Sequence, residues 1–143
     1  TALNAAAAGV GQAFVETTFI RPEDMRDDWV KGSRIPDVMF IRAGRLATYK
    51  QENPDWRTRP LTLVPDLVVE VVSPTDGYSD VTEKVQRYLD DGVEFIWVVD
   101  PQRETVAVHQ LDSDLQTNLT MDDTLKVADL LPKFELKLSK LFA

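Results

Sequence analysis

The sequence predicts a single domain of the α/β (α+β) class, with a mixed β-sheet flanked by helices. Three observations predict this class. Apolar segments of β-branched and aromatic residues recur along the chain, one segment has the spacing of an amphipathic helix, and that helix lies between two apolar runs. The chain has 143 residues, which is the size of one domain and enough to bury a core without disulfides or a metal.

The first part of the chain is expected to contribute two strands. Residues 1–11 are alanine-rich and lack the basic start of a signal peptide, so they resemble the end of a helix whose beginning is missing. Residues 13–20 and 34–41 are rich in β-branched and aromatic side chains and predict strands, separated by a polar loop at 21–33. Residues 42–60 are interpreted as a polar excursion.

The central segment, residues 61–72, is the most apolar run and is typical of a strand covered on both faces. Pro74 ends it, because proline cannot continue a central ladder. A helix is predicted to begin at Asp80, with Glu83 three residues later as a capping box, and to end at Gly92.

The last part of the chain predicts a hairpin and a closing segment. Residues 94–100 read as another buried strand and pair with residues 104–110 across a short turn. The polar residues 112–123 are expected to form a loop or tip. Residues 124–131 and 134–138 are expected to be short elements that close the domain.

Composition excludes several kinds of chemistry. With no cysteine, the chain has no disulfide, thiolate zinc site or cysteine nucleophile, and its one histidine, His109, argues against a multi-histidine metal site. The net charge of −8 argues against nonspecific nucleic-acid binding by bulk charge, although a local basic patch remains compatible. No apolar run is long enough to span a membrane, and we expect the protein in the cytoplasm.

Glu70 and Asp37 are the first two candidate site residues. Glu70 lies among apolar neighbours in its strand, where a charge is costly unless it is paired, hydrogen-bonded or bound to a metal. Asp37 lies in a second apolar segment, and strands about 4.8 Å apart let two carboxylates share one cation. The alternatives are that Glu70 meets solvent or pairs with an arginine such as Arg87, and that Asp37 makes a turn after Pro36.

Lys84 is the third candidate, on the predicted helix beside its apolar face. A lysine there could position a metal-bound water or stabilise charge that develops on a phosphate. The alternative is a solvated lysine paired with Asp80, four residues earlier. Asp66 shares a strand face with Glu70 but lies roughly 13 Å from it, too far to share one ion. We therefore interpret Asp66 as a residue at the start of the strand.

Several motifs together resemble the Uma-two family of nucleases, described as restriction endonucleases, within the PD-(D/E)XK nuclease superfamily. The first two are Arg34-Ile-Pro-Asp37-Val and Pro65-Asp-Leu-Val-Val-Glu70-Val-Val-Ser-Pro74. The others are Asp80-Val-Thr-Glu-Lys84 with Tyr88, Gly92-Val-Glu-Phe-Ile-Trp-Val-Val-Asp-Pro101, and Leu131-Pro-Lys-Phe-Glu-Leu-Lys-Leu. The resemblance covers nearly the whole chain from about residue 13, and the combination is more specific than any single motif.

The resemblance implies a restriction endonuclease-like core and a Mg²⁺- or Mn²⁺-dependent endodeoxyribonuclease, a hydrolase that cleaves DNA. It implies that Asp37 and Glu70 are catalytic metal ligands and that Lys84 is the catalytic lysine. The family pattern is broken at position 72, which is Val rather than Lys, so the lysine role passes to the helix. The family also begins with a longer segment whose first helix carries another acidic residue, and we do not assign that role to Glu16.

Two further expectations accompany the resemblance. Residues 1–143 are expected to be one PD-(D/E)XK-like domain that lacks its N-terminal segment, and a homodimer is plausible because many related nucleases cut two strands as dimers. The alternative function is a catalytically weak or inactive nuclease-fold domain that acts in nucleic-acid or protein binding.

Overall fold

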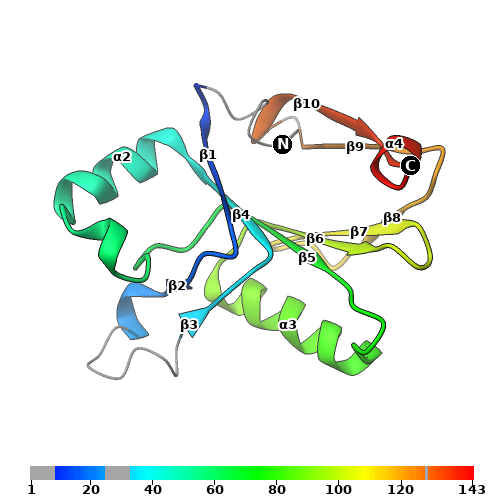
Figure 1. The fold of residues 1–143 in the computed structure, drawn as a ribbon, viewed down its shortest axis with the longest axis horizontal. Helices are drawn as coiled ribbons and strands as arrows, with labels where there is room; N and C mark the ends of the chain where they lie inside the picture. The colour runs from blue at the N-terminus through cyan, green and yellow to red at the C-terminus, as the bar shows by residue number, and fades with distance from the viewer. Residues whose placement is uncertain (1–8, 25–32, 128) are drawn as a thin grey trace.

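A six-stranded mixed sheet forms the centre of the molecule in a computed structural model that describes residues 9–24, 33–127 and 129–143 (Figure 1). Its strands lie in the order β1-β4-β5-β6-β7-β8. The β5–β6 pair is parallel and the other neighbouring pairs are antiparallel. The strand bounds are β1 Gly11–Val15, β4 Val38–Arg42, β5 Leu67–Val71, β6 Phe95–Asp100, β7 Thr105–Gln110 and β8 Thr117–Leu119. The predicted mixed sheet is confirmed.

Helix α3 (Tyr78–Asp91) makes the crossover between the parallel strands β5 and β6. It begins two residues before the predicted start, and Gly77 rather than Asp80 is its N-cap. Asp80 is the capping partner instead, because its Oδ2 accepts a hydrogen bond from the Gly77 N–H at 3.3 Å. The predicted end is confirmed: Gly92 adopts a φ of 96°, which favours glycine.

Residues 42–60 contain a helix that the polar composition did not predict. Helix α2 (Ala43–Glu52) buries only Leu46 and Tyr49, so its apolar stripe is too narrow to stand out in the sequence. A short 3₁₀ helix, η3 (Trp56–Thr58), follows, and the Lys50 ammonium lies 4.5 Å from the Trp56 ring centre. Tertiary packing therefore decides the structure of this segment.

The two predicted N-terminal strands are each broken. The segment 13–20 divides into β1 and β2 (Phe19–Ile20), because the chain turns at Glu16, where φ is 46°. The segment 34–41 divides into β3 (Ser33–Arg34) and β4, with Pro36 in the gap. Strands β2 and β3 pair as a small separate sheet. A 3₁₀ turn, η1 (Pro22–Asp24), follows β2, and the remaining predicted loop up to residue 32 lies outside the described residues.

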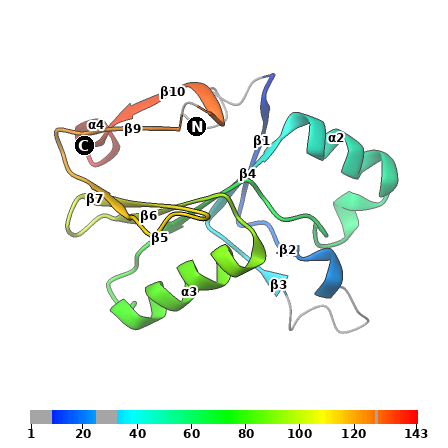
Figure 2. The same cartoon turned by 180° about the vertical axis from the view of Figure 1, so that it is seen from behind.

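The C-terminal segment covers the face of the sheet opposite to α3 (Figure 2). Strands β9 (Thr124–Val127) and β10 (Leu131–Lys137) pair with each other and lead into α4 (Leu138–Leu141). The predicted loop at 112–123 holds β8, which is one of the two edge strands of the main sheet. Its side chains are mostly exposed, so it lacked the apolar signal of a strand.

Two cores lie on opposite faces of the sheet. One packs β9, β10 and α4 against the sheet, and the other packs α2 and α3 against it. Along β5, Leu67 and Val69 belong to the first core, whereas Val68 belongs to the second. Because side chains alternate along a strand, Glu70 points to the face that carries α3. No helix in the described ranges is long and apolar enough to cross a membrane.

Candidate active site

The structure brings Asp37 and Glu70 directly opposite each other on neighbouring strands. In the antiparallel β4–β5 pair, Val38 faces Val69, and one further step of this register places Asp37 opposite Glu70. Side chains opposed in this way have Cβ atoms about 5 Å apart. Both carboxylates lie at the end of the β4–β5 pairing, on the face of the sheet that carries α3. Two residues that are 33 positions apart in the sequence are therefore neighbours in the fold.

Each of the two carboxylates has one oxygen held by a hydrogen bond. The Val71 backbone N–H donates to Asp37 Oδ2 at 2.7 Å, and the Tyr88 hydroxyl donates to Glu70 Oε1 at 2.5 Å. Within the described ranges, no N–H or O–H group donates to Asp37 Oδ1 or Glu70 Oε2, and the two carboxyl groups lie within hydrogen-bonding reach of each other. One oxygen of each carboxylate is therefore available to a ligand.

The electrostatic surroundings of Glu70 favour a bound cation. Burial raises the pKa of Glu70 above its usual range, and the facing Asp37 carboxylate adds to that shift. The hydrogen bond from Tyr88 and the positive charge of Lys84 act in the opposite direction on this pKa. Two like charges side by side repel each other, and a positive ion between them would remove that repulsion.

Lys84 lies on α3 one turn before Tyr88 and is exposed. With Glu70, Asp76 and Asp80 it lines a small pocket of about 20 Å³, which has room for roughly one water molecule. Neither Lys84–Asp80 nor Arg87–Glu70 forms an ion pair among the residues that the structure describes. The alternative partners that the sequence suggested for Lys84 and Glu70 are therefore not found in this part of the chain.

The two opposed carboxylates fit a hard divalent cation. Carboxylate oxygen suits Mg²⁺ and Mn²⁺, and Mg²⁺ commonly takes one or two protein carboxylates and completes its shell with water and phosphate oxygens. In the described part of the chain, no group of three or more His, Cys, Asp or Glu side chains could hold a metal ion. A cation held by the two carboxylates would take water and phosphate oxygens in its other positions.

Tyr88 is the site residue that the sequence did not predict as functional. Burial raises the pKa of its phenol and the adjacent Glu70 raises it further, so the hydroxyl stays protonated and can donate. A tyrosine on the apolar stripe of a helix reads as a core residue in the sequence. The signals were its spacing, one helical turn after Lys84, and its place in the motif that the chain shares with the Uma-two family.

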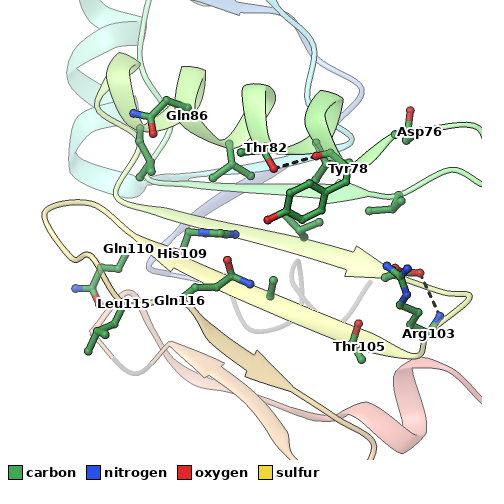
Figure 3. Close-up of a pocket in the computed structure, with 18 of the residues that line it drawn as sticks. Asp76, Tyr78, Thr82, Gln86, Arg103, Thr105, His109, Gln110, Leu115 and Gln116 are labelled. Atoms are coloured by element: carbon green, nitrogen blue, oxygen red, sulfur yellow. Dashed lines mark hydrogen bonds and ion pairs between the residues drawn. The ribbon is translucent and has the colours of Figure 1, made fainter.

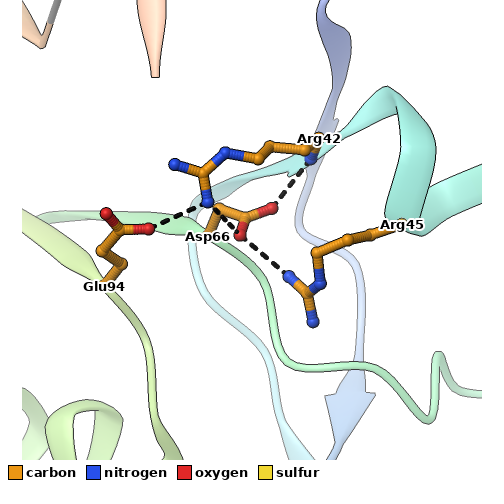
Figure 4. Close-up of polar contacts among 4 residues, drawn as sticks. All are labelled: Arg42, Arg45, Asp66 and Glu94. Atoms are coloured by element: carbon orange, nitrogen blue, oxygen red, sulfur yellow. Dashed lines mark hydrogen bonds and ion pairs between the residues drawn. The ribbon is translucent and has the colours of Figure 1, made fainter. Parts of the chain in front are cut away.

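Asp66 belongs to a separate charged cluster at the other end of β5 (Figure 4). Its side chain is 6% exposed, and Arg42 and Arg45 each place an Nη1 at 2.9 Å from Oδ1. The Arg42 backbone N–H donates to Oδ2 at 2.8 Å, and Arg42 also pairs with Glu94 at 2.9 Å. This cluster ties the start of β5 to the start of α2, and the Arg42 guanidinium lies between the Asp66 and Glu94 carboxylates.

Asp91 forms a third charged cluster at the end of α3. Its side chain is 3% exposed and lies 3.3 Å from Arg21 Nε and 3.2 Å from Arg34 Nε. Burial raises the pKa of Asp91, and the two arginines oppose that shift. This cluster joins the β2–β3 pair to α3, which also places Arg34 close to Tyr88.

A groove of about 1080 Å³ lies between α3 and strand β7 (Figure 3). Tyr78, Thr82 and Gln86 of the helix face Thr105 and His109 of β7 across it. Its described lining carries five aspartates and one arginine, and burial lowers the pKa of His109, so this histidine adds no charge at neutral pH. The groove shares the wall formed by Val72, Asp76, Val81, Val85 and Val98 with the small pocket at Glu70.

Comparisons with known proteins agree with this fold. A crystal structure of a putative nuclease belonging to DUF820 from Anabaena variabilis ATCC 29413 superposes with a TM-score of 0.75 and 20% sequence identity. The match covers 99% of this chain and 74% of that one. Among curated proteins no significant match is found. The model of the Uma2 family, described as a putative restriction endonuclease, matches residues 1–139, and the chain therefore belongs to this family.

Proposed function

We propose that this protein is a Mg²⁺- or Mn²⁺-dependent endodeoxyribonuclease that hydrolyses phosphodiester bonds. The observation that carries the proposal is the opposed pair Asp37 and Glu70, in which a protein N–H or O–H group holds one oxygen of each carboxylate and the two carboxyl groups lie within reach of each other. Membership of the Uma2 family supports nuclease activity. The carboxylate pair supports metal dependence, and the description of the family as a restriction endonuclease supports a DNA substrate.

The residues of the site would divide the work between them. Asp37 Oδ1 and Glu70 Oε2 would hold the cation, and Lys84 would meet the phosphate from the helix side and offset its charge. A divalent cation bound there would supply Lewis-acid chemistry, since it acidifies water and polarises a phosphoryl oxygen. Asp37 and Glu70 would also fix the direction from which the phosphate approaches, because β4 and β5 hold both side chains.

The charge of the surface suggests how DNA would approach. The groove beside α3 carries five aspartates in its described lining, so a phosphate backbone would be repelled there. Exposed Lys84 offers a cation next to the two carboxylates. We therefore place the scissile phosphate over the Lys84 side of the helix. Cleavage of both strands would call for two copies of the site, which a homodimer in the cytoplasm would provide.

The test is a calorimetric titration of Mn²⁺ into the wild-type protein, Asp37→Asn and Glu70→Gln. We expect one saturable site in the wild type and none in either variant. Nicking of supercoiled plasmid should require Mg²⁺ or Mn²⁺ and should be lost in both variants. Wild-type protein that binds no Mn²⁺ would refute the metal-dependent mechanism.

A second candidate is a catalytically weak or inactive nuclease-fold domain that binds nucleic acid or protein. Two observations favour it: the net charge of −8, and a lysine on the helix rather than at position 72 of the strand. Under this alternative, Mn²⁺ would bind at Glu70, but plasmid nicking would not exceed that of Glu70→Gln. The same pair of measurements thus separates the two functions.

A further inference from the structure

Tyr88 reaches the candidate site from the interior of the protein. The residue is 4% exposed, and its hydroxyl donates to Glu70 Oε1 at 2.5 Å. A buried tyrosine needs a partner for its hydroxyl, and a carboxylate is a strong acceptor because the bond is charge-assisted. The partner in this structure is one of the two carboxylates of the candidate site rather than a backbone carbonyl.

The ring of Tyr88 is held firmly behind that hydroxyl. Its centroid lies 6.2 Å from that of Phe19, which is fully buried, and both residues belong to the core under α2 and α3. Gly92 and Val93 end the helix just beyond, and the Val93 N–H donates to the Tyr88 carbonyl at 3.0 Å. Since backbone and ring are both fixed, the hydroxyl has little freedom to follow Glu70 if that side chain turns away.

Glu70 gains from such a rigid partner because its side chain has three rotatable bonds. Asp37 is shorter, and the Val71 backbone N–H already fixes its Oδ2. Glu70 has Tyr88 as its hydrogen-bond donor within the described ranges. The two carboxylates are thus held in the same way. A single donor binds one oxygen of each carboxylate, and the other oxygen accepts from no N–H or O–H group in the described ranges.

We propose that Tyr88 is a positioning residue, which holds Glu70 Oε1 so that Oε2 stays turned toward Asp37 and the cation site. This inference rests on the proposed function, because it needs a cation at the carboxylate pair. Groups that orient metal ligands typically change metal affinity by about 10- to 100-fold when they are removed. We expect the lower end of that range, since only the hydroxyl is lost.

The test compares Tyr88→Phe with Tyr49→Phe. Tyr49 is a matched control: it is 7% exposed, it packs in the same core, and its hydroxyl accepts a hydrogen bond from the Thr62 N–H at 2.9 Å. Mn²⁺ is titrated calorimetrically into both variants at a pH where Glu70 is ionised, and unfolding by urea is followed in parallel. Both substitutions keep the ring and the packing, so both variants are expected to fold.

We expect Tyr88→Phe to weaken Mn²⁺ binding about tenfold. Tyr49→Phe should leave Mn²⁺ affinity unchanged even if it lowers the free energy of unfolding as much as Tyr88→Phe does. Tyr88→Phe with wild-type affinity would overturn the positioning role, and so would an equal loss of affinity in Tyr49→Phe. If the wild type itself binds no Mn²⁺, both this inference and the proposed function fail; if only Glu70→Gln loses binding, the proposed function stands and the role of Tyr88 falls.

Discussion

Asp66 and Glu70 are acids four residues apart at the two ends of strand β5, and the structure compensates them in opposite ways. Asp66 is almost fully buried and meets two arginines and a backbone N–H. Glu70 is partly buried and meets a tyrosine hydroxyl and a second carboxylate. An acid whose charge is already neutralised serves the fold. One that faces another acid is costly to the fold unless a proton or a cation relieves the repulsion, and such an acid is a candidate for a functional site.

This difference could not be read from residue type. Both acids precede or interrupt the same apolar run, and both share one strand face by alternation. Arg42 and Arg45 reach Asp66 because α2 begins where β4 ends, so a predicted polar excursion supplies the cations. At the other end of β5, the antiparallel register supplies Asp37 instead. Four substitutions or conditions test the comparison.

Asp66→Asn should produce the largest change in stability. It removes the charge that holds Arg42 and Arg45, and breaking a fully buried pair costs about 3–5 kcal/mol. Because the two arginines are 37% and 41% exposed, water relieves part of that cost. We expect a loss of about 2 kcal/mol in the free energy of unfolding, measured by urea denaturation.

Mn²⁺ affinity should survive in Asp66→Asn if the cluster is purely structural. Asp55→Asn is a suitable control, because its exposed ion pair with Arg59 at 3.5 Å should change stability by at most about 0.5 kcal/mol. A loss of Mn²⁺ binding in folded Asp66→Asn would show that the two ends of β5 are not independent.

Lys84→Gln should slow plasmid nicking while leaving Mn²⁺ binding nearly unchanged. Removing a buried donor to developing charge typically costs about 10²–10³ in rate. Lys84 is exposed to solvent, so we expect a smaller effect, about tenfold, equivalent to about 1.4 kcal/mol. Arg87→Gln, three residues further along the same helix, is the matched control. Equal losses in both variants would assign the effect to general charge rather than to Lys84.

Metal binding should weaken as the pH falls through the raised pKa of Glu70. Burial and Asp37 raise this pKa, so protonation begins to compete with the cation at a higher pH than for an ordinary glutamate. Below that pKa, Mn²⁺ affinity should fall by about tenfold for each pH unit. Calorimetric titrations across a pH series would measure this. A profile that follows an ordinary glutamate would mean that the pKa of Glu70 is not raised, and an affinity that does not fall with the pH would mean that Glu70 is not a ligand.

Glu70→Gln should make the metal-free protein slightly more stable at neutral pH. A carboxyl whose pKa is higher in the folded state stabilises the fold when protonated, and that contribution is lost as the pH rises through the folded pKa. At neutral pH the ionised Glu70 is therefore a cost, and an amide removes it while still accepting from Tyr88. We expect a gain of about 1 kcal/mol in urea unfolding without metal, opposite in sign to Asp66→Asn. A loss of stability would contradict this interpretation of the site.

The sequence by itself determined the mixed sheet, the crossover helix with its Gly92 cap and the β6–β7 hairpin, and it suggested the three candidate site residues. These features depend on local signals: apolar periodicity, one glycine in a left-handed conformation, and a charge set among apolar neighbours. Such signals involve residues that are close in the sequence, so they can be recognised without the structure.

Only the tertiary structure decided the rest. Helix α2 and strand β8 have weak apolar patterns and form because the sheet provides a surface or an edge to pair with. The strands broken at Glu16 and Pro36, the register that sets Asp37 against Glu70, and the hydroxyl of Tyr88 on Glu70 all depend on contacts between distant segments. What separates a structural acid from a candidate catalytic one is the charge brought beside it, and folding sets that neighbour.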